Sequence, residues 1–410
     1  MPVGKSSFVR HLGGAIGNVR PGPVGGLATL IVVLGLAAVL TAPTEARPDR
    51  GTSRVLQKGI YDDAQILYGD PNKVFTTLRA LGAKVVLVSL WWGGVNGVAR
   101  RRPTDPSDPG DPAYRWDTYD RTVQFARAAG IEPIFTVIGT PSWANGAAGW
   151  NVAPKQTNDL RQFVIAAARR YSGTFHAADG STLPPVRKWI AWNEPNNPVF
   201  LRPQYRRQAS RWVMQSAFDY AAICNAVVRA AKFVQPLNQV ACGATSPRGN
   251  NQPGSTRASV SPLAFLRALK RAGAKGFDAY AHHPYYGSTA ETPLSPPPPA
   301  KRGAPPTAVT LGNITSLETT LAGLYSHHVR LWITEYGYQT NPPDSTIGVS
   351  LDNQAKYMKE AWRIAKADPT IDTFIWFLLR DESRLDGWQS GLYSTTGKAK
   401  PAVQAFESLH

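Results

Sequence analysis

Short apolar runs alternate with longer amphipathic stretches along the chain after residue 56. The short runs are rich in β-branched and aromatic residues, which suit buried strands. Eight strands are predicted, at residues 58–61, 84–90, 132–138, 188–193, 239–245, 277–283, 330–335 and 373–379. The longer stretches place apolar residues at helical spacing. The clearest helices are predicted at residues 119–130, 160–171, 262–273 and 353–366.

This alternation of strands and helices is typical of a parallel sheet covered by helices. Eight units in the space available match an α/β fold of the (β/α)8 TIM-barrel type. A doubly wound open sheet is the alternative, but no G-x-G-x-x-G or P-loop pattern announces its phosphate-binding turn. We therefore predict one barrel domain over residues 47–410, following an N-terminal export segment.

The N-terminal segment has the composition of an export signal. Residues 1–26 contain three basic residues and no acidic one, and an apolar run of 16 residues, Leu27 to Ala42, follows. This run is shorter than the ~20 residues that span a bilayer. Residues 1–46 are predicted to be a signal peptide or a membrane anchor. Either reading makes the protein secreted or associated with the cell envelope.

Export changes how the cysteines are interpreted. Cys224 and Cys242 are the only two in the chain, and an oxidising compartment would preserve a bridge between them. Cys224 falls on a predicted helix and Cys242 on the strand that follows it. A disulfide and two separately buried thiols both remain open. No Cys/His spacing indicates zinc.

The chain carries a formal net charge of +17. Such a charge could favour an acidic polymer as partner. The basic residues are scattered, however, apart from Arg100, Arg101 and Arg102, which is typical of a general compositional bias. No nucleic-acid-binding motif is present, so no nucleic-acid partner is expected. The chain is expected to be a monomer.

Two predicted strands end on a glutamate. The fourth strand runs into Asn193 and Glu194 and is stopped by Pro195, which cannot donate to a sheet ladder. The seventh strand ends on Glu335, which is followed by an aromatic residue. In a (β/α)8 barrel both glutamates would lie at the C-terminal mouth, where carboxylates are candidates for catalysis.

The segments "WNEPN" and "ITEYGY" resemble the two signature segments of clan A glycoside hydrolases, with the cellulase-like family 5 and the β-xylosidase-like family 39 as the nearest branches. The resemblance extends from about Lys58 to residues 391–406. It implies Glu194 as general acid/base and Glu335 as nucleophile. The chemistry asks for such a pair, because one carboxylic acid must protonate the departing oxygen while a carboxylate attacks the anomeric carbon. Glu335 is therefore expected to be ionised.

The resemblance also implies residues that support this pair. Asn193 resembles the asparagine that bonds the sugar 2-hydroxyl. His283 and Tyr285 resemble the histidine and tyrosine of the sixth strand, where the tyrosine hydroxyl orients the nucleophile. Trp376 resembles the aromatic floor under the cleaved sugar.

Further aromatic residues follow the second and third predicted strands. Trp143, Trp91 and Trp92 would lie at the barrel mouth, where aromatic faces suit stacking on a sugar. Trp143 and Trp92 are candidate substrate-binding residues. Trp91 and Trp92 are adjacent on a strand and point to opposite faces, so one of the two is expected in the core.

One feature departs from the pattern. Many clan A members carry an arginine on the second strand that supports the nucleophile, whereas Leu87 or Ser89 stands there in this chain.

His282 and His283 point to opposite faces of a strand and cannot share a metal ion. No metal and no cofactor are expected.

The sequence predicts an exported, retaining glycoside hydrolase that acts on a polysaccharide or oligosaccharide. A non-catalytic carbohydrate- or envelope-binding barrel is an alternative, and the two glutamates argue against it. A transglycosylase that remodels an envelope glycan would use the same residues.

Overall fold

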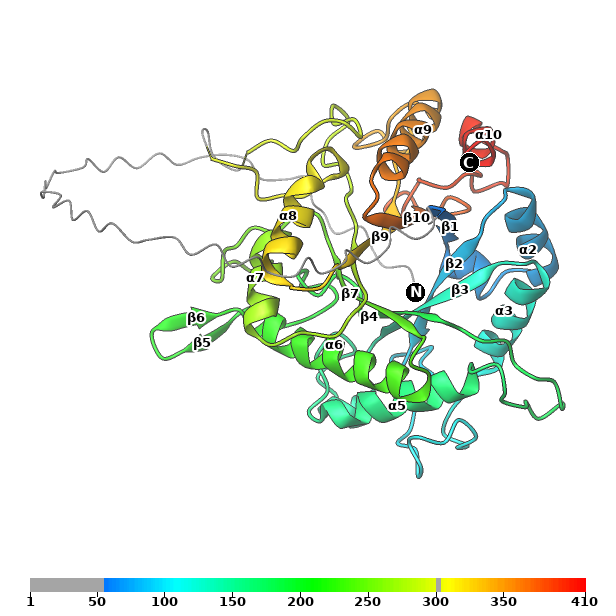
Figure 1. Ribbon diagram of the computed structural model, residues 1–410. Helices are drawn as coiled ribbons and strands as arrows, with labels where there is room; N and C mark the ends of the chain where they lie inside the picture. Colours follow the sequence, from blue (N-terminus) through cyan, green and yellow to red (C-terminus); the bar gives the residue numbers. More distant parts are fainter. Residues whose placement is uncertain (1–54, 300–303) are drawn as a thin grey trace, which may run out of the picture. The chain divides into compact units, whose positions relative to one another are not determined.

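The computed structural model describes residues 55–299 and 304–410, which form an eight-stranded parallel barrel. The strands are joined in the closed order β1-β10-β9-β8-β7-β4-β3-β2 (Figure 1). Their bounds are β1 Gln57–Tyr61, β2 Val85–Trp91, β3 Glu132–Ile138, β4 Lys188–Ala191, β7 Gln239–Thr245, β8 Ala279–His282, β9 Arg330–Tyr336 and β10 Ile371–Phe377. The predicted fold class and all eight predicted strands are confirmed.

A ring of helices covers the barrel. One helix follows each strand in turn: α2 Pro71–Ala80, α3 Asp117–Ala128, α5 Thr157–Arg170, α6 Gln215–Val234, α7 Pro262–Arg271, α8 Thr315–Leu324, α9 Leu351–Ala367 and α10 Pro401–Glu407. The four helices predicted from periodicity correspond to α3, α5, α7 and α9. Short helices α1 Asp63–Ile66 and α4 Ser142–Asn145 and the 3-10 turn Leu311–Asn313 lie in the loops.

The strands are apolar on both faces because both faces are buried. Small and branched side chains and one tryptophan fill the inside of the barrel: Val85, Leu87, Ile134, Ile190, Ala241, Ala244, Ala279, Ala281, Trp332 and Ile375. Larger side chains such as Phe135, Trp189 and Phe374 point outward and pack against the helices. The closed interior supports the strand tips that carry the candidate site.

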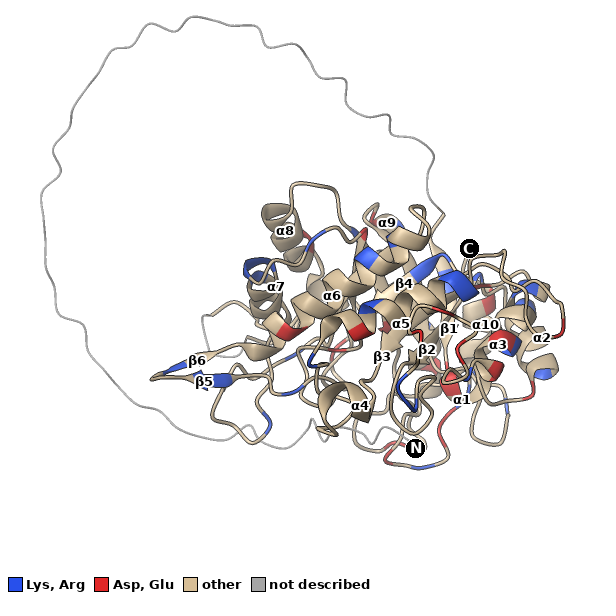
Figure 2. Cartoon of the chain, turned by 90° about the horizontal axis from the view of Figure 1, so that it is seen from below, with Lys and Arg blue, Asp and Glu red and all other residues tan. Residues whose placement is uncertain are grey.

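The loop between β4 and α6 contains an element that the sequence did not predict. Two short antiparallel strands, β5 Arg206–Gln208 and β6 Arg211–Val213, form a hairpin there. The hairpin projects beyond the helices, and basic residues lie on both of its strands (Figures 1 and 2). Its strands are three residues long and contain mostly arginine and glutamine, so no apolar run marks them.

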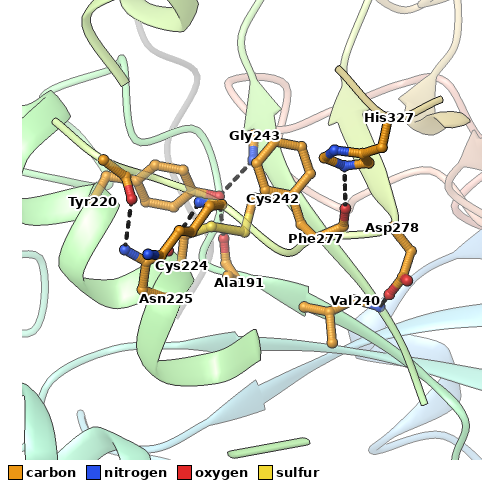
Figure 3. The surroundings of a disulfide bond; sticks show 12 residues. Ala191, Tyr220, Cys224, Asn225, Val240, Cys242, Gly243, Phe277, Asp278 and His327 are labelled. Atoms are coloured by element: carbon orange, nitrogen blue, oxygen red, sulfur yellow. Dashed lines mark hydrogen bonds between the residues drawn. A yellow bond between two sulfur atoms is a disulfide. The ribbon is translucent and has the colours of Figure 1, made fainter. Parts of the chain in front are cut away.

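Cys224 and Cys242 form a disulfide that joins α6 to β7 (Figure 3). This resolves the alternative that the sequence left open. The neighbouring Tyr220 strengthens the same junction, because its hydroxyl donates to the carbonyl of Ala191 at 2.6 Å and accepts from the Gly243 N–H at 2.6 Å. Helix α6 is thereby attached to both β4 and β7.

Replacing both cysteines by serine is expected to lower stability without affecting catalysis. The bridge closes a loop with a sequence separation of 18 residues, for which the loss is about 3 kcal/mol of unfolding free energy. Denaturant unfolding would measure this loss, with the reduced wild-type protein as control. A large drop in kcat in a folded double variant would contradict the expectation.

The predicted signal peptide or anchor, residues 1–46, lies outside the described residues. Among the residues that the structure describes, no helix is both long enough and apolar enough to cross a bilayer.

Candidate active site

Glu194 lies just beyond the tip of β4, in a backbone conformation that side chains rarely adopt. Its φ is +36° and that of Trp192 is +66°, a region that costs ordinary residues of the order of 1 kcal/mol. Hydrogen bonds hold this turn, since the Glu194 N–H donates to the Ala244 carbonyl and the Asn197 side chain donates to the Glu194 carboxylate at 2.8 Å. The carboxylate is thus fixed at the barrel mouth.

Glu335 reaches the mouth because β9 contains an irregularity. Between two paired positions, β10 advances two residues, Phe374 to Trp376, while β9 advances three, Ile333 to Tyr336. Such bulges re-aim side chains near active sites. As a result, the adjacent residues Thr334 and Glu335 both contact site residues, which regular strand alternation would forbid.

His283 lies between the two glutamates. Its Nδ1 atom is 3.1 Å from Oε1 of Glu194 and 3.6 Å from Oε2 of Glu335, while its Nε2 atom is 3.0 Å from the Thr334 hydroxyl. The Tyr285 hydroxyl donates to Oε2 of Glu335 at 3.1 Å. One ligand atom from each of Glu194, His283 and Glu335 lies within 4.8 Å of the other two. The structure therefore brings together four residues that the sequence singled out.

Burial raises the pKa of Glu335 to about 7; the charge of His283 opposes the shift and that of Glu194 adds to it. Burial therefore opposes the ionised form expected of Glu335 in the ligand-free site, and its ionisation stays a prediction. Burial disfavours the cationic form of His283, yet the carboxylates of Glu335 and Glu194 outweigh it and raise its pKa. The charges of Glu335 and His283 thus stabilise one another inside the buried site.

Tyr61, Asp63 and Ser89 lie on the side of the site where many clan A members carry an arginine. Ser89 on β2 is buried, and its hydroxyl lies 2.8 Å from that of Tyr61 on β1. The Ser89 N–H donates to Asp63 at 3.0 Å. Burial raises the pKa of Asp63 to about 6, and its charge adds to the rise at Glu335. An acid thus lies near Glu335 on this side, where the pattern would supply a cation.

The site could also hold a metal ion. Among the described residues, one set of His, Cys, Asp and Glu side chains has ligand-like spacing, namely Glu194, His283 and Glu335. His282 faces away, with hydrogen bonds to Thr245 and to the Val309 carbonyl, so the two adjacent histidines do diverge. That the site needs no metal stays a prediction.

No family model and no curated protein matches the sequence, but solved structures do. A family 39 glycoside hydrolase from the gut symbiont Bacteroides cellulosilyticus WH2 matches with a TM-score of 0.60 at 20% identity, covering 87% of this chain and 64% of its own. A glucosidase from Croceicoccus marinus gives 0.61 at 16% identity, with 87% and 69% covered. A monomeric β-xylosidase from Caulobacter crescentus CB15 gives 0.57 at 18%, with 87% and 68% covered.

The chain has the fold of the family 39 glycoside hydrolases. The resemblance inferred from the two signature segments is thereby confirmed for the fold. The chain spans less than two thirds of the Bacteroides protein's length.

Within this family 39 fold, two of the aromatic residues predicted to contact the sugar are buried away from the site. Trp376 is fully buried, points to the outer layer and donates to the Ser390 carbonyl, so it cannot floor the site. The inward position at this strand end belongs to Phe377, whose ring lies 6.3 Å from that of Tyr285. Strand β10 alternates regularly along β1, with Ile375 inside the barrel and Phe374 and Trp376 outside, so the resemblance placed the aromatic floor one residue too early.

Trp92 is likewise completely buried, stacked on Phe163 in the outer core, and the prediction that it contacts substrate is wrong. Its neighbour Trp91 is the half-buried member of the pair and contacts Trp150 edge to face. Trp143 is half-buried, with Arg102 over its ring at 4.5 Å. Trp143 thus remains accessible from the rim, and its role in binding stays a prediction.

Besides Thr334, Phe377 and Asp63, the side chains of Asn197 and Trp388 lie at the site and were not predicted from the sequence. Asn197 orients Glu194 through the hydrogen bond to its carboxylate. Its position three residues after Glu194, in "NEPNN", is the sequence feature that could have identified it. Trp388 comes from the loop after β10, and its ring lies 5.3 Å from that of Tyr285 and 5.4 Å from that of Phe377. Asn193 is half-buried directly before Glu194, so it lies where a sugar hydroxyl could reach it.

Tyr285→Phe is expected to move the acid limb of kcat/KM to higher pH. The lost hydrogen bond stabilises the carboxylate form of Glu335, so its pKa would rise above about 7 and the ionised fraction would fall at any given pH. The limb reports the free enzyme. We also expect about a tenfold loss of kcat/KM at neutral pH. Tyr286→Phe is the matched control, because that hydroxyl donates to the Ile347 carbonyl instead. An unmoved limb would refute the role of Tyr285.

Proposed function

We propose that the protein is a retaining glycoside hydrolase. The observation that carries this proposal is the pair Glu194 and Glu335 at the tips of β4 and β9. One carboxylate oxygen of Glu194 lies within 4.8 Å of one carboxylate oxygen of Glu335. Retaining enzymes hold their carboxyl groups ~5–5.5 Å apart, whereas inverting enzymes leave ~6.5–9.5 Å for a water molecule. The short separation supports two displacements at the anomeric carbon. The fold and the glycosidase activities named for its structural neighbours add support.

The geometry suggests a role for each group. In the first step Glu335 attacks the anomeric carbon, and Glu194 donates its proton to the leaving oxygen. In the second step Glu194 takes a proton from water, which attacks the same carbon and releases Glu335. Asn197 and His283 hold the Glu194 carboxylate, and Tyr285 holds that of Glu335. Phe377 and Trp388 provide apolar faces for the C–H side of the sugar.

Product configuration tests this proposal. The protein would be screened against a panel of aryl glycosides and polysaccharides, and proton NMR of the first sugar released would be recorded before mutarotation. Retention of the substrate's configuration is expected. An inverted product would reject Glu335 as nucleophile, and the absence of turnover on every glycan would favour the binding-barrel alternative. Products lengthened at high acceptor concentration would identify a transglycosylase.

We also infer that the protein is exported. The apolar run Leu27 to Ala42 follows a basic segment, and the disulfide suits an oxidising compartment. The substrate would then be a carbohydrate outside the cytoplasm. Cell fractionation, with and without residues 1–46, tests this inference.

A further inference from the structure

The hairpin β5–β6 is an exposed ribbon that contributes nothing to the core. None of its six strand residues is buried, and Trp212 is 46% exposed. Two-stranded hairpins are marginally stable by themselves. A bulky aromatic residue left in water on such a ribbon suggests a surface that meets a ligand.

The hairpin is strongly basic. Residues 195–218 contain four arginines and no acidic residue. Asp219 lies near Arg206, but none of the ion pairs between described residues includes Arg207 or Arg211. Arg207 donates its Nε–H to the Ala209 carbonyl at 3.3 Å, and its two terminal nitrogens and the guanidinium of Arg211 are available to an anionic ligand.

One face of the ribbon combines charge with an aromatic ring. Arg207 pairs with Trp212 across the two strands, and its guanidinium carbon lies 5.9 Å from the ring centroid. Cross-strand partners share a face. An exposed indole stacks on the C–H face of a pyranose, while a guanidinium binds a carboxylate through two parallel hydrogen bonds. The pair offers both to one acidic sugar.

The hairpin is fixed to the candidate active site at its base. The Gln204 side chain donates to the carbonyl of Pro195, which directly follows Glu194, at 2.9 Å. The Ser216 N–H donates to the Gln204 carbonyl at 3.2 Å, closing the base of the loop. The hairpin thus starts from the barrel end that holds the catalytic pair.

We propose that the Arg207–Trp212 face of the hairpin binds carboxylate-bearing units of an anionic polysaccharide. This inference rests on the proposed function and names its substrate class. Among the described residues, three acidic side chains, Asp63, Glu194 and Glu335, face the single basic side chain of His283 at the reaction centre, so a carboxylate-bearing sugar is disfavoured there. The polymer therefore presents an uncharged unit for cleavage while its acidic units lie on the hairpin.

Binding of two matched polymers tests the proposal. The whole chain carrying Glu335→Gln would be passed over immobilised carboxymethyl-cellulose and over hydroxyethyl-cellulose, which share a backbone and differ in charge. We expect at least about tenfold tighter binding to the carboxylated polymer, weakened by added salt. Arg207→Ala/Trp212→Ala should remove about tenfold of this affinity.

Arg161→Ala/Phe233→Ala is the matched control, because Arg161 also lies 5.9 Å from the ring of the exposed Phe233. It removes the same kinds of groups from α5 and α6 and should leave the affinity unchanged. Equal losses in both double variants, no loss in the hairpin variant, or equal binding to the neutral polymer would each overturn the proposal. So would hairpin-dependent binding to phosphatidylglycerol vesicles without binding to the carboxylated polymer.

Aryl glycoside turnover separates this proposal from the proposed function. The cluster of Glu194, His283 and Glu335 contains no hairpin residue, so the hairpin variant made in the wild-type background should keep its kcat on a small aryl glycoside. Turnover without polymer binding rejects the hairpin site alone. Hairpin-dependent polymer binding without turnover of any glycan rejects the hydrolase alone.

Discussion

Glu335→Gln is expected to reduce kcat on an aryl glycoside by at least about 10⁴-fold, because an amide cannot form the glycosyl ester through which both steps pass. In the wild-type protein, an activated 2-fluoro glycoside should label the peptide that contains Glu335. Mass spectrometry of a proteolytic digest measures both the mass added and its position. The variant should show no label.

Glu318→Gln is the control for loss of a partly buried glutamate. Burial raises the pKa of Glu318 to about 7 as well, but this side chain accepts a hydrogen bond from Thr370 at the opposite end of the barrel. Its kcat should equal that of the wild type. A label on any residue other than Glu335, or an active Glu335→Gln protein, would remove Glu335 from the mechanism.

Glu194→Ala is expected to affect substrates according to their leaving group. Substrates with a poor leaving group, which depend on proton donation, should lose roughly 10²–10⁴-fold in kcat/KM. A dinitrophenyl glycoside should lose far less, since its leaving group departs without a proton. Added azide should restore turnover and yield a glycosyl azide, because the removed carboxylate leaves space for an anionic nucleophile.

The matched variant is Glu132→Ala, which removes a glutamate from the first residue of β3, at the other end of the barrel. Its side chain is 64% exposed, so no change in activity is expected. Equal losses on both leaving-group classes in Glu194→Ala would rule out Glu194 as proton donor.

The barrel strands were predictable because each is buried on both faces. A strand such as β3, with six buried residues in a row, appears in the sequence as a continuous apolar run between polar stretches. The hairpin β5–β6 is the opposite case. Its residues face water on both sides, so no apolar period marks them, and three-residue strands are too short to show one.

The candidate catalytic pair was predictable for a related reason. Glu194 and Glu335 each interrupt an apolar run at its end, where a buried strand meets the solvent. The side chains around them were harder to assign, because counting alternate residues fails where a strand ends. Positive φ angles at Trp192 and Leu378 and the irregular register of β9 break the alternation there. Trp376 was chosen by resemblance and not by such counting, although Phe377 faces the site.

The raised pKa of Glu335 could not be predicted from the sequence. This raised pKa arises from the burial of Glu335 in the barrel mouth and from the nearby acids Glu194 and Asp63, which only the closed barrel brings together. The pairing of Cys224 with Cys242 depended in the same way on how α6 lies against β7.

The closed base of the hairpin loop has an evolutionary consequence. Because Gln204 is hydrogen-bonded both to the turn after Glu194 and to Ser216, residues 205–215 form an insert whose two ends are already joined. Such an insert can be lengthened, shortened or exchanged between relatives without moving the strand tips, since loop closure depends only weakly on length. Homologues are therefore expected to diversify here first, acquiring new polymer preferences while the reaction centre stays the same.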